Sequence, residues 1–145
     1  MEDVGSVSCK GTPQHTELRA RSRLRWFFVI LCGLGISIAS SISGDSIPRG
    51  LPAHFDKIVH FTEFALLGFL VMRAVLMSRL RSGRPSAAPI VIVFAVAALV
   101  CVFGGLDELR QMFTPGRDVS GYDLIADGAG GLVGASAGWL FGGLS

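Results

Sequence analysis

Four long apolar blocks, separated by short polar connectors, constrain this chain more than any other feature of its sequence. The blocks lie at about residues 24–42, 58–77, 89–106 and 123–144. A helix needs about 20 mostly apolar residues to cross a bilayer, and each block is close to that length. With the connectors counted, the 145 residues leave no room for a sizeable soluble domain. The sequence therefore predicts an all-α, polytopic integral membrane protein, a small bundle of about four transmembrane helices.

The segment before the first block, residues 1–23, is polar and shows no apolar periodicity. It is predicted to be a disordered cytoplasmic lead-in, and residues 24–145 are predicted to form the transmembrane domain. A cleaved signal peptide is an alternative, because Ile38, Ala39, Ser40 and Ser41 could form a cleavage site after a basic and an apolar segment. The long lead-in and the near-spanning length of the block favour a retained first helix.

Basic and acidic residues are segregated along the chain, although the formal net charge is only +2. Four alternating spans place most arginines, among them Arg19, Arg25, Arg79 and Arg84, on one side of the membrane. The positive-inside rule then predicts that both termini are cytoplasmic. Most acidic residues fall at or toward the outer face. This distribution indicates membrane lipids as partners and gives no indication of nucleic acid.

Helical spacing gathers polar side chains on three of the predicted spans. Asp56, His60 and Glu63 share one helix face because their spacings are four and three. The same rule pairs Asp107 and Glu108 with Gln111, and Asp123 with Asp127. Charges at this depth must pair, become neutral or meet water, because an unpaired one costs at least about 2.5 kcal/mol on insertion scales. We therefore expect the three faces to meet in one small volume.

Small residues dominate the last apolar block and predict close helix packing. Gly130 and Gly134 form a GxxxG pair, and Gly128 and Gly138 extend the stripe. The bland alternative is that glycine is simply common in membrane helices. Close packing is favoured, and the sequence leaves open whether it occurs within one bundle or in a homo-oligomer.

Three segments resemble the VanZ-like family of membrane proteins. DKIVHFTEF at residues 56–64 is similar to its D-K-x-x-H-x-x-x-[YF] segment, DELRQMFTPGR at 107–117 to D-E-x-x-Q-x-F-x-P-G-R, and DLIADGAG at 123–130 to D-x-x-x-[ND]-x-x-G. Arg110 stands where the family often has histidine, and Asp127 where it often has asparagine. The family is named after a protein linked to resistance against teicoplanin, a lipoglycopeptide that acts outside the membrane. The resemblance implies an integral protein of the bacterial inner (cytoplasmic) membrane. It leaves the biochemical reaction open.

These observations define a candidate polar site at the outer face. Its predicted members are Asp56, Lys57, His60, Glu63, Asp107, Glu108, Gln111, Arg117, Asp123 and Asp127. The expected ligand is an envelope precursor, a lipid head group or a lipoglycopeptide antibiotic. Two structural readings compete with it: His60 and Glu63 as an interhelical clamp, and Arg117 as an internal salt bridge to a nearby acid.

Two other function classes stay open: a membrane-embedded enzyme acting on a lipid-linked or phosphorylated substrate, and a small proton-coupled transporter. The sequence leans away from an enzyme, because the metalloprotease, nucleophile-elbow and phosphate-loop motifs are absent. No cofactor is expected. A metal held by His60, Glu63 and Glu108 or Asp127 is chemically possible but is not the favoured reading. The three cysteines predict neither a disulfide nor a zinc site.

Overall fold

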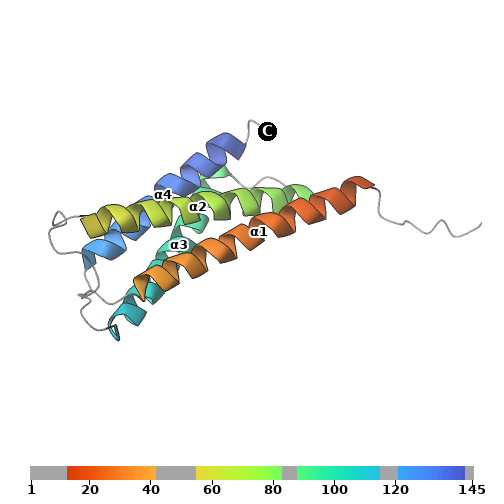
Figure 1. The fold of residues 1–145 in the computed structure, drawn as a ribbon. Helices are drawn as coiled ribbons and strands as arrows, with labels where there is room; N and C mark the ends of the chain where they lie inside the picture. The colour runs from red at the N-terminus through yellow and green to blue at the C-terminus, as the bar shows by residue number, and fades with distance from the viewer. Residues whose placement is uncertain (1–12, 42–54, 83–87, 115–120, 143–145) are drawn as a thin grey trace, which may run out of the picture.

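A computed structural model describes residues 13–41, 55–82, 88–114 and 121–142 of the chain. Throughout these ranges the regular structure is helical: α1 (Pro13–Ser40), α2 (Phe55–Ser82), α3 (Pro89–Gln111) and α4 (Gly121–Gly142). The helices run alternately up and down (Figure 1). All four are long and apolar enough to cross a membrane. The predicted all-α fold with four spanning helices is confirmed.

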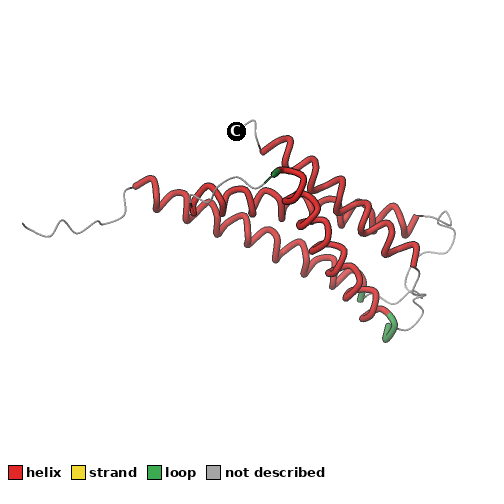
Figure 2. Tube along the Cα trace, turned by 180° about the vertical axis from the view of Figure 1, so that it is seen from behind, coloured by secondary structure: helices red, strands yellow, loops and turns green. Residues whose placement is uncertain are grey.

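The first helix begins earlier than expected. Residues 13–23 belong to α1, so the prediction of a disordered lead-in is wrong for them, and residues 1–12 lie outside the described ranges. Pro13 suits the first position of a helix, and Glu17 and Arg21 have the spacing of a favourable pair. Because the span already provides a nucleus, adding turns to it is easy. The first turns of α1 project beyond the other three helices, as Figure 2 also shows from behind.

The bundle has a thin apolar core and a largely apolar exterior. Phe64, Met72, Val100 and Ala135 pack in the core, while large hydrophobic side chains such as Ile125 are exposed on the outside. A water-soluble bundle would place polar residues on that exterior. The exposed apolar surface is therefore what a hydrocarbon environment requires.

The closest helix pair is α2 and α4, and glycines make this proximity possible. A Cβ atom added at Gly130 would collide with the carbonyl oxygen of Phe61, and one at Gly134 with that of Ala65. The GxxxG pair predicted from the sequence thus packs against α2 of the same chain, because only a glycine lets two helix backbones approach so closely. This face of α4 is covered within the bundle.

The other two glycines of the predicted stripe differ from each other. A Cβ atom at Gly138 would lie 2.9 Å from the Cβ of Met72, so Gly138 also needs its missing side chain. At Gly128 the nearest atom would be the Cys101 Sγ at 3.6 Å, which is an ordinary contact. The prediction of close packing is therefore wrong at Gly128, because that position turns toward the Cys101 side chain of α3, which leaves room for a Cβ atom.

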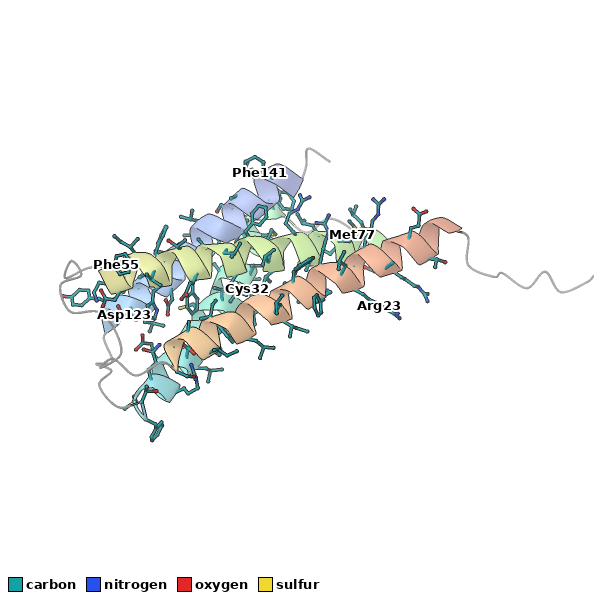
Figure 3. All side chains as sticks on the ribbon, viewed as in Figure 1. Arg23, Cys32, Phe55, Met77, Asp123 and Phe141 are labelled. Atoms are coloured by element: carbon teal, nitrogen blue, oxygen red, sulfur yellow. The ribbon has the colours of Figure 1, made fainter. Side chains whose placement is uncertain are left out.

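Charge separates the two ends of the bundle. At one end the first half of α1 joins the last half of α2: Arg25 donates to the Arg73 carbonyl oxygen at 3.4 Å, and Trp26 to the Ser78 hydroxyl at 3.0 Å. The other end, called the polar end below, is formed by the last turns of α1 and α3 and the first turns of α2 and α4. Figure 3 shows Asp123 at the polar end and Arg23 toward the basic one.

Candidate functional site

A histidine–carboxylate pair joins α2 to α4 inside the polar end. His60 Nδ1 lies 3.0 Å from Asp127 Oδ1, and both side chains are buried. The imidazole lies parallel to the Phe64 ring, with the ring centroids 6.2 Å apart. Because Phe64 is itself fully buried, the orientation of the imidazole is fixed on one side by an acid and on the other by an aromatic ring.

A lysine joins the same two helices nearer the surface. Lys57 Nζ lies 2.9 Å from Asp56 Oδ2 and 3.0 Å from Asp123 Oδ1. Asp56 is half exposed, whereas Asp123 is buried. Lys57 therefore neutralises part of the acidic charge where the cluster meets its surroundings. It also links the family-like segments of α2 and α4 in one ion-pair network.

Asp107 connects α3 to α1 on the other side of the cluster. Its carboxylate accepts hydrogen bonds from Gln111 Nε2 at 2.9 Å, Arg110 Nη2 at 2.8 Å and Ser40 Oγ at 2.5 Å. Ser40, on α1, was not among the predicted site residues. A small polar residue at the end of an apolar block was the one signal for it, and that signal is weak because serines are frequent in membrane helices.

Arg110 also binds α1 directly. Its Nη2 donates to the Ser37 carbonyl oxygen at 2.6 Å, and its Nη1 to the Ser41 hydroxyl. The arginine that replaces a frequent histidine of the family motif thus clamps α1 onto α3. Its role visible in the structure is positional.

Glu108 faces the histidine–carboxylate pair from α3. His60, Glu108 and Asp127 each offer a ligand atom, and these atoms lie within 4.8 Å of one another. All three side chains are buried. Of the predicted members, Glu63 is half-buried one turn along α2 from His60 and does not belong to this group of three. Arg117 and its predicted salt bridge lie outside the described residues.

The polar end carries an excess of negative charge among the described residues. Its cations are Lys57 and Arg110. Its carboxyl groups belong to Asp56, Asp107, Glu108, Asp123 and Asp127. The site is therefore suited to a cation or to a head group rich in hydrogen-bond donors, more than to a bare anion.

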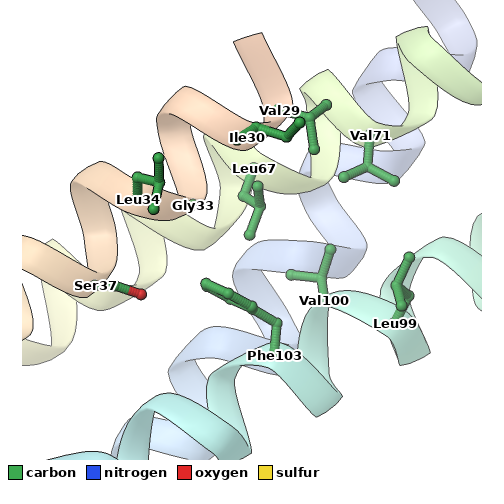
Figure 4. Close-up of a pocket in the computed structure, with 10 residues that line it drawn as sticks. All are labelled: Val29, Ile30, Gly33, Leu34, Ser37, Leu67, Val71, Leu99, Val100 and Phe103. Carbon is green, nitrogen blue, oxygen red and sulfur yellow. The ribbon is translucent and has the colours of Figure 1, made fainter. Parts of the chain in front are cut away.

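An apolar groove of about 380 Å³ leads from the membrane-facing surface to the polar end. It lies between α1, α2 and α3, and Ile30, Leu34 and Leu99 on its rim are more than half exposed. Ser37 is its one polar lining residue (Figure 4). Because the Ser37 carbonyl oxygen accepts a hydrogen bond from Arg110, the groove ends beside the Asp107 cluster. Sequence periodicity gave no sign of it.

Four apolar helices with a polar cluster gathered at one end define a multi-pass membrane protein. Comparison with protein families matches residues 11–142 to the VanZ/LLP1 family. The chain therefore belongs to that family, which confirms the resemblance seen in its three motif segments. No curated protein and no solved structure matches it.

The three family segments converge in space. The described residues of the first, on α2, meet those of the third, on α4, through His60 with Asp127 and through Lys57 with Asp123. The second segment, on α3, contributes Glu108 to the buried group and Asp107 to the contact with α1. The first segment, which lies more than forty residues before the other two, thus meets both of them at one end of the bundle.

Proposed function

We propose that this protein binds a lipid-linked molecule of the cell envelope, with the hydrocarbon chain in the groove and the head group at the polar end. The observation that carries the proposal is that Ser37 lines the groove and its carbonyl oxygen accepts a hydrogen bond from Arg110, a member of the polar end. An apolar groove that opens into a bilayer is surrounded by hydrocarbon chains. A ligand with such a chain and a polar head would occupy both parts at once.

The charge of the polar end narrows the head group. Carboxyl groups outnumber cations there, so an amine or another donor-rich head is favoured over an exposed phosphate. Envelope lipids and lipoglycopeptides both combine a hydrocarbon chain with a polar head. Either could therefore occupy the groove and the polar end together. A role in resistance to lipoglycopeptides would follow if the antibiotic, or the precursor that it binds, occupied the site.

The orientation proposed for the protein supports an envelope ligand. The arginine-rich end belongs in the cytoplasm by the positive-inside rule, with both termini. The polar end then faces outward, where envelope precursors are assembled and lipoglycopeptides act.

Two glycines of α1 offer a matched test. A Cβ atom at Gly33 would lie 3.5 Å from the Phe103 ring, on the groove, whereas one at Gly35 meets nothing within 4 Å. The variant Gly33→Leu should therefore fill part of the groove and lower labelling by a photoreactive phosphatidylethanolamine at least about threefold, since several favourable chain contacts are lost. Gly35→Leu adds the same side chain outside the groove and should be labelled like the wild type.

The same assay separates the possible sources of the ligand. Competition by teicoplanin would indicate a lipoglycopeptide site, and competition by a lipid-linked precursor alone would indicate an envelope lipid. Equal labelling of both glycine variants and the wild type would contradict the proposal.

The buried His60–Asp127 pair favours one alternative, a membrane-embedded enzyme acting on the same class of ligand. A histidine held by a carboxylate has the arrangement of a general base. This alternative predicts turnover of a lipid-linked substrate by the purified protein, lost in His60→Gln. A proton-coupled transporter has less support, since the buried ionisable side chains of the described helices lie together at one end.

A further inference from the structure

The deepest part of the polar end is built from three side chains of three different helices. His60 comes from α2, Glu108 from α3 and Asp127 from α4, and their ligand atoms lie within 4.8 Å of one another. All are at least nine-tenths buried, and Asp127 is only 1% exposed. All three side chains thus come from helices and lie inside the bundle.

Asp127 supplies a second, independent observation. Its Oδ1 is paired with His60, but its Oδ2 is buried and has no hydrogen-bond partner among the described residues. A buried carboxylate oxygen without a partner is costly. It is therefore a sign that a group outside the described residues satisfies it.

The surrounding backbone directs this oxygen toward α3. A Cβ atom added at Gly104 would lie 2.6 Å from Asp127 Oδ2, so the missing side chain at Gly104 leaves the space that the carboxylate occupies. Gly104 and Glu108 are four residues apart and share one face of α3. The unsatisfied oxygen thus points at the helix face that carries the second acid of the group.

We propose that His60, Glu108 and Asp127 bind one divalent transition-metal ion of the zinc or manganese class. One imidazole nitrogen and two carboxylates form a ligand set that suits these ions. Metal–ligand bonds of about 2.0–2.2 Å allow two ligand atoms on one ion to lie up to about 4.4 Å apart, so a small contraction of the group is enough.

Electrostatics favours a cation over the empty arrangement. Two carboxylates packed beside each other in a membrane repel, and each loses its hydration. A divalent ion neutralises both and satisfies the free oxygen of Asp127. Three protein ligands leave at least one coordination position open, which a head-group oxygen or nitrogen could take. In this respect the inference rests on the proposed function, although metal binding itself can be measured without any envelope ligand.

The test uses the full chain, purified in detergent and stripped with a chelator. Isothermal titration with Zn²⁺ and with Mn²⁺ should show about one ion per chain for at least one of the two metals. Asp127→Asn and Glu108→Gln should weaken that binding by more than about 100-fold, since loss of an outer-shell partner alone costs 10–100-fold. Glu17→Gln is the control, because it removes an exposed acid of α1 at the other end of the bundle, and its affinity should stay within about threefold of the wild type.

The wild type alone can overturn the inference, whether or not the variants fold. The absorption spectrum of bound Co²⁺ should show a site with nitrogen and oxygen ligands. If none of the three metals binds stoichiometrically, the site is excluded. An equal loss in Glu17→Gln would also overturn it, because the affinity would then follow the net charge of the protein and not these three ligands.

Photolabelling with and without chelator keeps this inference separate from the proposed function. Labelling that persists in a protein unable to bind metal would disprove the metal site and leave the ligand groove standing. Stoichiometric metal binding together with unchanged labelling of Gly33→Leu would support the metal site and contradict the groove.

Discussion

The buried acids of the polar end differ in how their oxygens are satisfied. Asp107 receives hydrogen bonds from three side chains, one of which comes from α1. Asp127 has one oxygen paired with His60 and the other without a hydrogen bond among the described residues. A carboxylate whose acceptor positions are filled by the protein is suited to holding helices together, and a half-filled one is suited to binding a ligand. We therefore assign Asp107 to the scaffold and Asp127 to the site.

The scaffold role of Asp107 predicts the effect of removing its donor on α1. Ser40→Ala should lower the free energy of unfolding by about 1–2 kcal/mol, because hydrogen bonds to buried charges are stronger than neutral ones while those measured in membranes are modest. Ser136→Ala is the control, since the Ser136 hydroxyl bonds only to the Leu132 carbonyl oxygen of its own helix. Unfolding in mixed micelles measures both. Equal stability of the two variants would argue against the α1–α3 connection.

The site acids and His60 could be predicted from the sequence because helical spacing puts them on common faces. Their partners could not. The sequence grouped His60 with Glu63 of its own helix, whereas the structure pairs it with Asp127 of α4. This pairing depends on how α2 and α4 are rotated against each other. Ser40 lies 67 positions from Asp107, and no local pattern distinguishes it from other serines in an apolar block.

At the scale of the helix, the glycines of α4 determine how closely it approaches α2. Gly134→Ala should destabilise the bundle by about 1–3 kcal/mol, because even one methyl group would meet the backbone of Ala65 and push the helices apart. Gly128→Ala adds the same methyl group where only an ordinary contact with Cys101 results, so it should change stability by less than about 0.5 kcal/mol. Thermal unfolding in detergent compares the two. Similar melting temperatures would show that the glycine stripe tolerates separation of α2 and α4.

The extents of the helices were predictable only where apolar residues mark them. Helix α3 starts at Pro89, where its apolar block starts, but continues past the block to Gln111. Likewise, α1 starts at Pro13 and α2 continues to Ser82, because polar helix-forming residues extend a helix without changing its hydropathy signal. Apolar length measures how much of a helix lies in hydrocarbon, and the helix itself is longer.

For the molecule as a whole, the two ends of the bundle carry opposite charge. Arginines gather where α1 begins and α2 ends, whereas carboxyl groups gather where α2 and α4 begin. The helix dipoles of α2 and α4 also stabilise acidic groups near their first turns. The helix dipoles and the separation of charge along the bundle therefore favour the same position for these acids. The acidic cluster thus lies at the end of the bundle opposite the arginines, and the proposed orientation follows from the same distribution of charge.

This orientation predicts which residues a membrane-impermeant thiol reagent reaches in intact cells. In a background without the native cysteines, a single cysteine at exposed Asp56 should be labelled from outside, because the proposed orientation places the polar end there. A cysteine at Ser82, exposed at the other end of α2, should be labelled only after permeabilisation. The two positions lie on one helix, so each controls for the expression and insertion of the other. The reverse pattern would place the acidic cluster in the cytoplasm and, with it, exclude a ligand captured from the outer face of the membrane.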